Sequence, residues 1–156
     1  MTISAQTYKP SKGALENSFI IELNEKDSSV IFNNLSNYIT RTYRDESSSF
    51  RGTIGDKFIR FTGVESNAIY QCGWCVNFTV RYTVAIDVKD GKIRVNLEQV
   101  DNGHGSSFNL YYFKKDGSLR KNKANRKSFN SMKSVLQSLL TDLTEAAEGN
   151  NSSSNW

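Results

Sequence analysis

The chain has 156 residues, of which 37% are hydrophobic and 12% aromatic, so it suits one domain with a real hydrophobic core. One proline and ten glycines argue against a Pro/Gly-rich disordered chain. Its formal net charge of +4 is mildly basic and far from the charge density of a dedicated nucleic-acid binder. No run of about 18 apolar residues is present, which excludes a predicted membrane span. Two cysteines are too few for a disulfide-rich scaffold.

The first third of the chain predicts a strand, a helix and a pair of short strands. Residues 17–23 (NSFIIEL) indicate the first strand, and Asp27-Ser28-Ser29 offers N-cap candidates for a helix over 28–43. Apolar residues then follow helical spacing and form one stripe, made of Ile31, Leu35, Tyr38, Ile39 and Tyr43. Gly55-Asp56 is expected to join two short strands by a tight turn, and a polar loop is expected around residues 63–67.

The clearest pattern in the chain is a strict alternation of apolar and polar residues. The apolar members are Phe78, Val80, Tyr82, Val84, Ile86 and Val88, and they alternate with Asn77, Thr79, Arg81, Thr83, Ala85 and Asp87. A period of two over this length predicts a long strand with one buried face. Asp90-Gly91 favours a type I′ turn, after which the alternation resumes, so residues 76–88 and 92–100 are predicted to form a hairpin.

The last third predicts a further strand, a basic loop and a final helix. Phe108, Leu110 and Tyr112 indicate the strand, and residues 114–127 the loop. Ser128 is expected to cap a helix whose apolar stripe is Met132, Leu136, Leu139, Leu140 and Leu143.

These elements together predict a single α+β domain over residues 16–148. We expect a curved antiparallel sheet with two helices packed on its apolar face, in the order β-α-β-β-β-β-(β)-α. A flexible segment over 1–15 and a disordered tail over 149–156 are expected to flank it.

Cys72 and Cys75 lie in CGWC, which is the only catalytic-looking signature in the chain. A thioredoxin-type C-x-x-C begins a helix, whereas a strand-like sequence follows here. In an extended chain, residues i and i+3 lie roughly 10 Å apart, which exceeds the roughly 7 Å between Cα atoms that a disulfide tolerates. By parity Cys72 falls on the buried face and Cys75 on the open face. Structural cysteines are the favoured interpretation, and a thiol redox pair is the alternative.

The single histidine constrains both metal binding and catalysis. A zinc site would have to combine Cys72, Cys75, His104 and Asp101, but a loop histidine flanked by glycines is more typical of a solvated turn. Hydrolysis by a Ser–His or Cys–His pair would also need His104, and no G-x-S-x-G elbow accompanies it. No phosphate-binding glycine loop is present either. We therefore predict that the protein is not an enzyme and uses no cofactor.

A cluster of cations is the main sign of a charged partner. Its members are Lys114, Lys115, Arg120, Lys121, Lys123, Arg126 and Lys127, next to Tyr111, Tyr112 and Phe113. Cations of this kind neutralise phosphates, and neighbouring aromatic rings can stack on bases. The competing interpretation is a solvated loop beside a strand, because no nucleic-acid-binding motif is present.

Several segments resemble a family found in Bacteroidetes, the domain of unknown function with a TATA-binding-protein-like (TBP-like) fold. They are the strand FIIEL, a helix that ends near a tyrosine, the strand pair around RGTIGDKFIRF, and the hairpin VRYTVAIDVKDGKIRVNL. The turn of the family hairpin is matched by Lys89, Asp90, Gly91, Lys92 and Arg94. The resemblance covers about residues 15–102. It implies a TBP-like α+β fold and export to the periplasm or the cell surface, and it supplies no activity or site residues.

The leading functional hypothesis is a non-enzymatic binding or assembly module, exported to the periplasm or the cell surface. We expect it to contact a protein or glycan through an edge strand or through the polar sheet face of Asn77, Thr79, Arg81, Thr83 and Asp87. The alternatives are nucleic-acid or polyanion binding through residues 114–127 and thiol redox chemistry at Cys72 and Cys75. Residues 1–16 lack the apolar core of a signal peptide, so the protein is expected to be cytoplasmic if Met1 is its native start.

Overall fold

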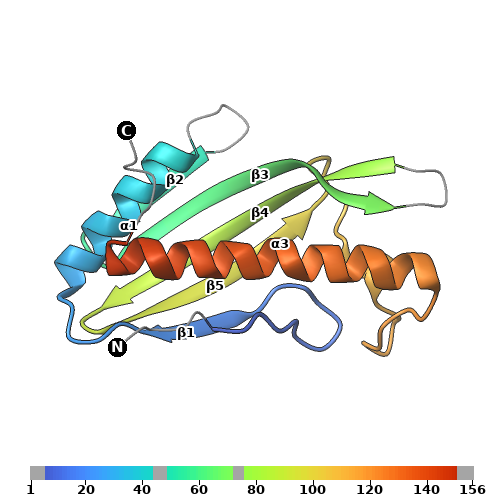
Figure 1. Cartoon of the computed structure of the whole chain (residues 1–156), viewed down its shortest axis with the longest axis horizontal. Helices are drawn as coiled ribbons and strands as arrows, with labels where there is room; N and C mark the ends of the chain where they lie inside the picture. The colour runs from blue at the N-terminus through green and yellow to red at the C-terminus, as the bar shows by residue number, and fades with distance from the viewer. Residues whose placement is uncertain (1–5, 44–48, 72–75, 151–156) are drawn as a thin grey trace.

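The computed structural model describes residues 6–43, 49–71 and 76–150. It has a curved five-stranded antiparallel sheet of order β1-β5-β4-β3-β2, with the long helix α3 running along one face (Figure 1). The elements in chain order are β1 (Ser18–Glu22), α1 (Ser28–Thr42), β2 (Ser49–Ile54), β3 (Phe58–Gln71), β4 (Val76–Lys89), β5 (Lys92–Asp101), α2 (Asn109–Tyr112) and α3 (Lys123–Glu148). The predicted α+β class, a curved antiparallel sheet with helices on one face, is confirmed.

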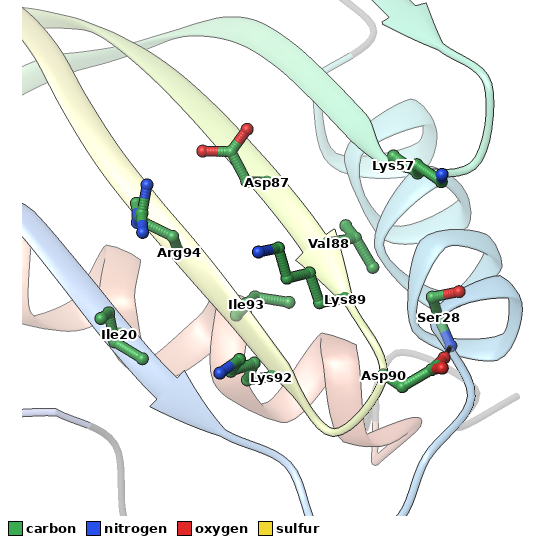
Figure 2. A pocket seen from close by; sticks show the side chains of 10 residues that line it. All are labelled: Ile20, Ser28, Lys57, Asp87, Val88, Lys89, Asp90, Lys92, Ile93 and Arg94. Atoms are coloured by element: carbon green, nitrogen blue, oxygen red, sulfur yellow. Dashed lines mark hydrogen bonds between the residues drawn. The ribbon is translucent and has the colours of Figure 1, made fainter.

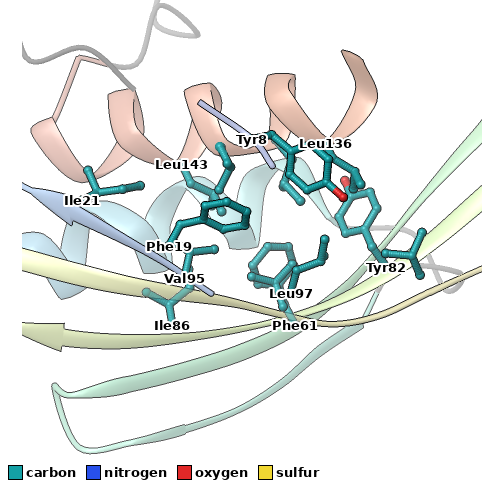
Figure 3. Packing of buried hydrophobic residues seen from close by; sticks show 14 of the residues in the cluster. Tyr8, Phe19, Ile21, Phe61, Tyr82, Ile86, Val95, Leu97, Leu136 and Leu143 are labelled. Atoms are coloured by element: carbon teal, nitrogen blue, oxygen red, sulfur yellow. The ribbon is translucent and has the colours of Figure 1, made fainter. Parts of the chain in front are cut away.

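The core lies between one face of the sheet and the helices. The apolar residues of β4 alternate as predicted, and Val80, Tyr82, Val84, Ile86 and Val88 are all buried. Figure 3 shows the neighbouring strands contributing Phe19, Ile21, Phe61, Val95 and Leu97 to the same layer, which packs against Leu136 and Leu143 of α3. Because strand side chains alternate between faces, this burial leaves every second residue of each strand on the opposite face.

The hairpin of β4 and β5 is confirmed, but its turn is not the predicted type. A type I′ turn needs positive φ at both central residues, whereas only Gly91 has positive φ (72°). Tertiary hydrogen bonds fix the turn instead. The Ser28 backbone N–H donates to Asp90 Oδ1 (N···O 2.8 Å), and the Gly91 N–H donates to the Lys26 carbonyl (2.9 Å). The hairpin tip is therefore anchored to the connection between β1 and α1.

Two predicted boundaries are wrong for the same reason, which is that local polarity does not end an element here. The loop expected around residues 63–67 is part of β3, which continues to Gln71 and accommodates the polar residues by a register shift between Glu65 and Ile69. The last helix begins five residues before Ser128, because the Asn122 side chain caps it by accepting the Asn125 N–H (2.8 Å).

The strand predicted from Phe108, Leu110 and Tyr112 is also wrong, because these residues belong to α2 and its N-cap. Phe108 and Tyr112 are both buried, and their rings stack with centroids 5.9 Å apart. Leu110 is 81% exposed, as the intervening position of a single helical turn allows. The Tyr112 hydroxyl also lies 2.6 Å from Ser128 Oγ, which makes Ser128 a buried partner of α2 and not a cap.

The segment before residue 16, which we expected to be flexible, packs on the domain from Tyr8 onward. Tyr8 and Leu15 are buried, and the Tyr8 hydroxyl donates to the Leu15 carbonyl (2.6 Å). The Tyr8 N–H donates to Gln137 Oε1 on α3 (2.6 Å). Residues 1–5, and residues 151–156 of the predicted tail, lie outside the described residues.

Gly63 is fixed by the ring that lies across it. Gly63 of β3 is the Cα partner of Tyr82 on β4, and a Cβ at Gly63 would come within 2.4 Å of Tyr82 Cε2. The ring has little room to move, since Tyr82 is fully buried and its hydroxyl lies 3.0 Å from that of Tyr43. The absence of a side chain at position 63 is thus a packing requirement of the core.

We expect Gly63→Ala to lower the free energy of unfolding by about 1–3 kcal/mol, because it overpacks the core against Tyr82. Urea denaturation of the two proteins measures this difference. The matched control is the same substitution in a Tyr82→Leu background, where the cost should shrink because the ring is gone. An equal cost in both backgrounds would show that the Tyr82 ring is not the cause.

Candidate functional site

The sheet face opposite the helices, called the open face below, carries the five residues of β4 that were predicted as a partner surface. Asn77 is exposed, and Thr79, Arg81, Thr83 and Asp87 are partly buried. They alternate with the core residues of β4, so the structure places them together on the open face. Their role in binding remains a prediction.

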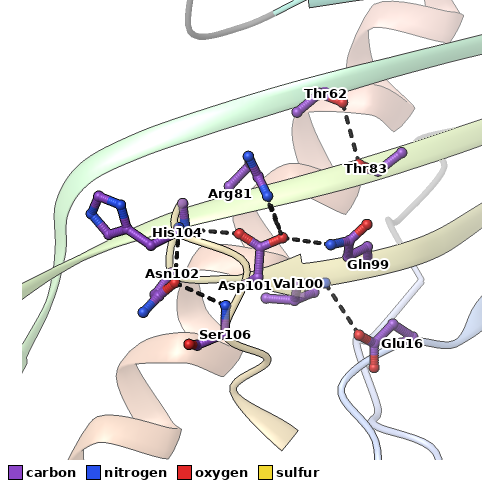
Figure 4. A network of polar contacts seen from close by, with 11 residues as sticks. Glu16, Thr62, Arg81, Thr83, Gln99, Val100, Asp101, Asn102, His104 and Ser106 are labelled. Atoms are coloured by element: carbon purple, nitrogen blue, oxygen red, sulfur yellow. Dashed lines mark hydrogen bonds and ion pairs between the residues drawn. The ribbon is translucent and has the colours of Figure 1, made fainter.

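Asp101 organises one end of the open face (Figure 4). Its carboxylate is buried and accepts hydrogen bonds from Arg81 Nη2 (3.0 Å), Gln99 Nε2 (2.7 Å) and the Gly103 N–H (2.7 Å). The next residue, Asn102, accepts the backbone N–H groups of His104 and Ser106 through Oδ1. Asp101 therefore joins β4, β5 and the 102–107 loop, and Arg81 is committed in part to this structural ion pair.

This arrangement gives no support to a metal site at the loop. Asp101 already uses its oxygens for structural hydrogen bonds, and His104 is exposed. Cys72 and Cys75 lie outside the described residues, so the thiol alternative stays a prediction. Within residues 6–43, 49–71 and 76–150, no group of three or more His, Cys, Asp or Glu side chains could hold a metal ion.

The middle of the open face is a polar strip whose groups partner one another. Thr62 and Thr83 are Cα partners on β3 and β4, and their hydroxyls lie 3.2 Å apart. Arg60 and Glu98 form a partly exposed ion pair, with 2.8 Å between Nη2 and Oε2. Exposed pairs of this kind contribute little stability. Because these polar groups partner one another, the strip has few unsatisfied groups to offer a ligand.

A groove of about 690 Å³ opens at the other end of the face, beside the tip of the β4–β5 hairpin (Figure 2). We call it the hairpin groove, and its lining is Ile20, Ser28, Lys57, Asp87, Val88, Lys89, Asp90, Lys92, Ile93 and Arg94. The β2–β3 turn reaches it because the Lys57 carbonyl accepts the Val88 N–H (2.7 Å). Of the predicted site residues, only Asp87 lines this groove.

The hairpin groove carries an excess of positive charge. It contains four cations and two acids, and both acids already accept hydrogen bonds. Asp90 accepts from the Ser28 N–H at the start of α1, and Asp87 Oδ2 accepts from Asn96 Nδ2 (3.1 Å). In the described part of the chain, the ion pairs within 4.0 Å are Arg60–Glu98 and Arg81–Asp101. None of the four groove cations, Lys57, Lys89, Lys92 and Arg94, is therefore neutralised by direct contact with a described acid.

As site residues, all four groove cations and Ile20 were missed by sequence reasoning. Lys89, Lys92 and Arg94 appeared in the sequence only as part of the family-like hairpin, without a predicted binding role. A usable signal was present for Arg94, because its alternation with the buried residues Ile93 and Val95 places it on the open face. Lys57 lies in the β2–β3 turn and Ile20 on the edge strand β1, and no local sequence pattern links either residue to the β4–β5 turn.

The predicted basic cluster lies at the opposite end of the domain from the hairpin tip, where α3 begins (Figure 1). All seven cations are exposed: Lys114, Lys115, Arg120 and Lys121 precede α3, and Lys123, Arg126 and Lys127 lie in its first two turns. The aromatic rings expected to assist them are mostly in the core, since Tyr112 and Phe113 are buried and Tyr111 is partly so. The cluster thus offers charge with little surface for base stacking.

A smaller acidic group on the helix side of the sheet belongs to neither site. Burial raises the pKa of Glu65, and the nearby Asp142 carboxylate on α3 raises it further. Burial followed by Glu145 raises the pKa of Asp142 in the same direction. These carboxylates repel one another, and they do not lie on the open face.

Neither the family models nor the curated proteins contain a match to this sequence. Solved structures share its fold, among them the following two. A TBP-like protein from Parabacteroides distasonis has a TM-score of 0.68 and 12% identity, over 94% of this chain and 100% of that chain. A DUF4468 family protein from Bacteroides ovatus has a TM-score of 0.66 and 13% identity, over 90% of each chain. The predicted TBP-like fold, with its resemblance to Bacteroidetes proteins, is confirmed, and at these identities the likeness concerns the fold alone.

No helix in the described part of the chain combines the length and apolar character needed to cross a membrane.

We expect Asp101→Ala to lower the free energy of unfolding by about 1–3 kcal/mol, because it removes a buried carboxylate that accepts hydrogen bonds from Arg81, Gln99 and the Gly103 N–H. Asp87→Ala is the matched control, since Asp87 lies on the same face, is only partly buried and accepts one described hydrogen bond. That change should cost less than about 1 kcal/mol. Chemical denaturation of both variants tests the difference, and equal losses would contradict the structural role of Asp101.

Proposed function

We propose that this protein is a non-enzymatic binding or assembly module that takes a protein or glycan partner on the open face of its sheet. The observation that carries the proposal is the hairpin groove, which has a volume of about 690 Å³ and four cations without a described acidic contact. Pockets of roughly 300–1,000 Å³ are the usual size for ligand sites. We further propose that the module acts in the periplasm or at the cell surface, as the family resemblance of its sequence implies.

The distribution of charge in the groove favours binding over a purely structural role. Lys89 and Lys92 are Cα partners across the hairpin, and directly opposed like charges destabilise a sheet. Lys92 and Arg94 follow one another on the same face of β5. An anionic group from a partner would offset this repulsion. In the free protein the nearby acids are Asp87 and Asp90, each already engaged, and Glu22 of β1, the exposed Cα partner of Lys92, which forms no ion pair within 4.0 Å in the described residues.

The position of the groove also connects it with an edge strand. β1 ends the sheet on this side, and Ile20 of β1 is 51% exposed within the groove lining. A partner in the groove therefore meets both surfaces that the sequence indicated, the polar face and an edge of the sheet. The helix side is unavailable, because α1 and α3 cover it and form the core.

The basic cluster supports a second candidate function, which is polyanion or nucleic-acid binding. The observation in its favour is that seven exposed cations gather around the start of α3. Such a surface binds phosphates in a salt-dependent manner. The burial of Tyr112 and Phe113 removes the stacking surface that single-stranded nucleic acids use, which favours the open face as the leading site.

Paired charge-reversal variants separate the two candidates. One is Lys89→Glu with Arg94→Glu in the hairpin groove, and the other is Lys115→Glu with Lys121→Glu in the basic cluster. Each is compared with the unaltered protein for binding to envelope proteins, a glycan array, and mixed DNA and RNA at low salt. We expect the groove variant to lose its protein or glycan partner and the basic-cluster variant to keep it.

Two results would contradict the proposal. The first is partner binding that survives in the groove variant and disappears in the basic-cluster variant, especially if the ligand is DNA or RNA. The second concerns export: fractionation of the cells that make the protein should place it in the periplasm or at the surface, and a purely cytoplasmic location would contradict that part.

A further inference from the structure

We propose that the ligand of the hairpin groove is an extended acidic peptide segment with carboxylates at alternate positions and an apolar side chain beside them. The inference rests on the proposed function, since it names the partner chemistry of the same groove.

Arg94 supplies the strongest recognition group. It lies directly opposite Asp87 across β4 and β5, yet the described contact of the Asp87 carboxylate is with Asn96 Nδ2. The Arg94 guanidinium has no acidic oxygen within 4.0 Å in the described residues. A free guanidinium binds a carboxylate through two parallel hydrogen bonds, which gives direction as well as affinity.

The spacing of the cations favours an extended chain. Lys92 and Arg94 are separated by one buried residue, Ile93, so they lie on the same face of β5 about 7 Å apart along the strand. Alternate side chains of an extended peptide have the same separation. A peptide running along β5 can therefore place one carboxylate at each cation, whereas adjacent acidic residues would point to opposite sides.

The remaining lining distinguishes a peptide from a sugar or a nucleic acid. None of the ten lining residues is aromatic, so the groove lacks the ring surfaces on which bases stack. Sugar rings likewise pack on flat aromatic faces. The groove instead offers the exposed aliphatic side chain of Ile20, the Cα partner of Arg94 on β1. An aliphatic side chain next to a carboxylate matches this pair.

The direct test measures fluorescence anisotropy of labelled peptides with the intact protein. The probe contains the repeat Glu-Ser-Glu-Ser-Leu, in which both glutamates and the leucine share one side of an extended chain. The control peptide, Glu-Glu-Ser-Ser-Leu, has the same composition and charge but places its two glutamates on opposite sides. We expect the probe to bind several-fold more tightly and to weaken as salt rises.

Two protein variants locate the binding. Arg94→Gln should weaken binding of the probe by about tenfold, the effect of losing a charge-assisted hydrogen bond. Arg126→Gln removes the same charge from the basic cluster and should leave the affinity unchanged. Both side chains are exposed, so thermal unfolding of each variant should match that of the unaltered protein.

The outcomes separate this inference from the proposed function. Equal binding of the two peptides, or full binding by Arg94→Gln, would overturn the inference. A uronic-acid oligosaccharide that binds in an Arg94-dependent manner where the peptides fail would also overturn it, while leaving the open face as a binding site. Loss of the proposed function has a different signature, which is a partner that binds the Lys89→Glu/Arg94→Glu protein as well as the unaltered one.

Discussion

The packing of α3 along a single face of the sheet is the constraint on which the rest of the structure depends. With 26 residues at 1.5 Å each, α3 is about 39 Å long, and the 14 residues of β4 extend about 46 Å. One helix thus spans most of the length of the central strands, and the shorter helix α1 packs on the same face at the hairpin end. No helix of the described residues covers the opposite face of the sheet, so the residues of that face must be compatible with solvent or with a partner.

This one-sided burial explains how the two faces of the same strands differ. On the helix side, space is so limited that only glycine at position 63 accommodates the Tyr82 ring. The buried Tyr82 hydroxyl forms its hydrogen bond with the hydroxyl of Tyr43. On the open face, polar side chains interact with neighbours on the same face, as Thr62 does with Thr83 and Arg81 with Asp101. The hairpin groove departs from that rule, because its acids accept hydrogen bonds from neighbouring donors and its cations form no ion pair within the described residues. The excess charge is therefore a property of the groove and not of the face as a whole.

The sequence predicted what strict periodicity controls. β4 alternates over its whole length, so its buried face and its pairing with β5 could be inferred directly, and the leucine stripe of α3 was equally plain. The predictions were wrong where tertiary contacts decide the local structure. Asn122 begins α3 before any apolar residue appears, and Phe108 and Tyr112 stack within one helical turn although their spacing also fits a strand.

The candidate site was harder to predict than the fold for a related reason. Asp87 was found because it sits on the alternating strand, but Ile20, Lys57 and Arg94 come from separate elements and meet only after the sheet assembles. The type of the hairpin turn was likewise decided by distant groups, since Ser28 and Lys26 hold Asp90 and Gly91. The seven basic residues near the start of α3 are close in sequence, which made them conspicuous without revealing that their aromatic neighbours are buried.

The central claim is that the open face, at the hairpin groove, is where this protein meets its partner. Titrating the isotope-labelled protein with the alternating acidic peptide and following its backbone amide chemical shifts tests this claim most directly. The account predicts saturable shifts at the β4–β5 hairpin and at Ile20 of β1, with little change elsewhere. Shifts centred on residues 114–127, or on the helix side of the sheet, would contradict it.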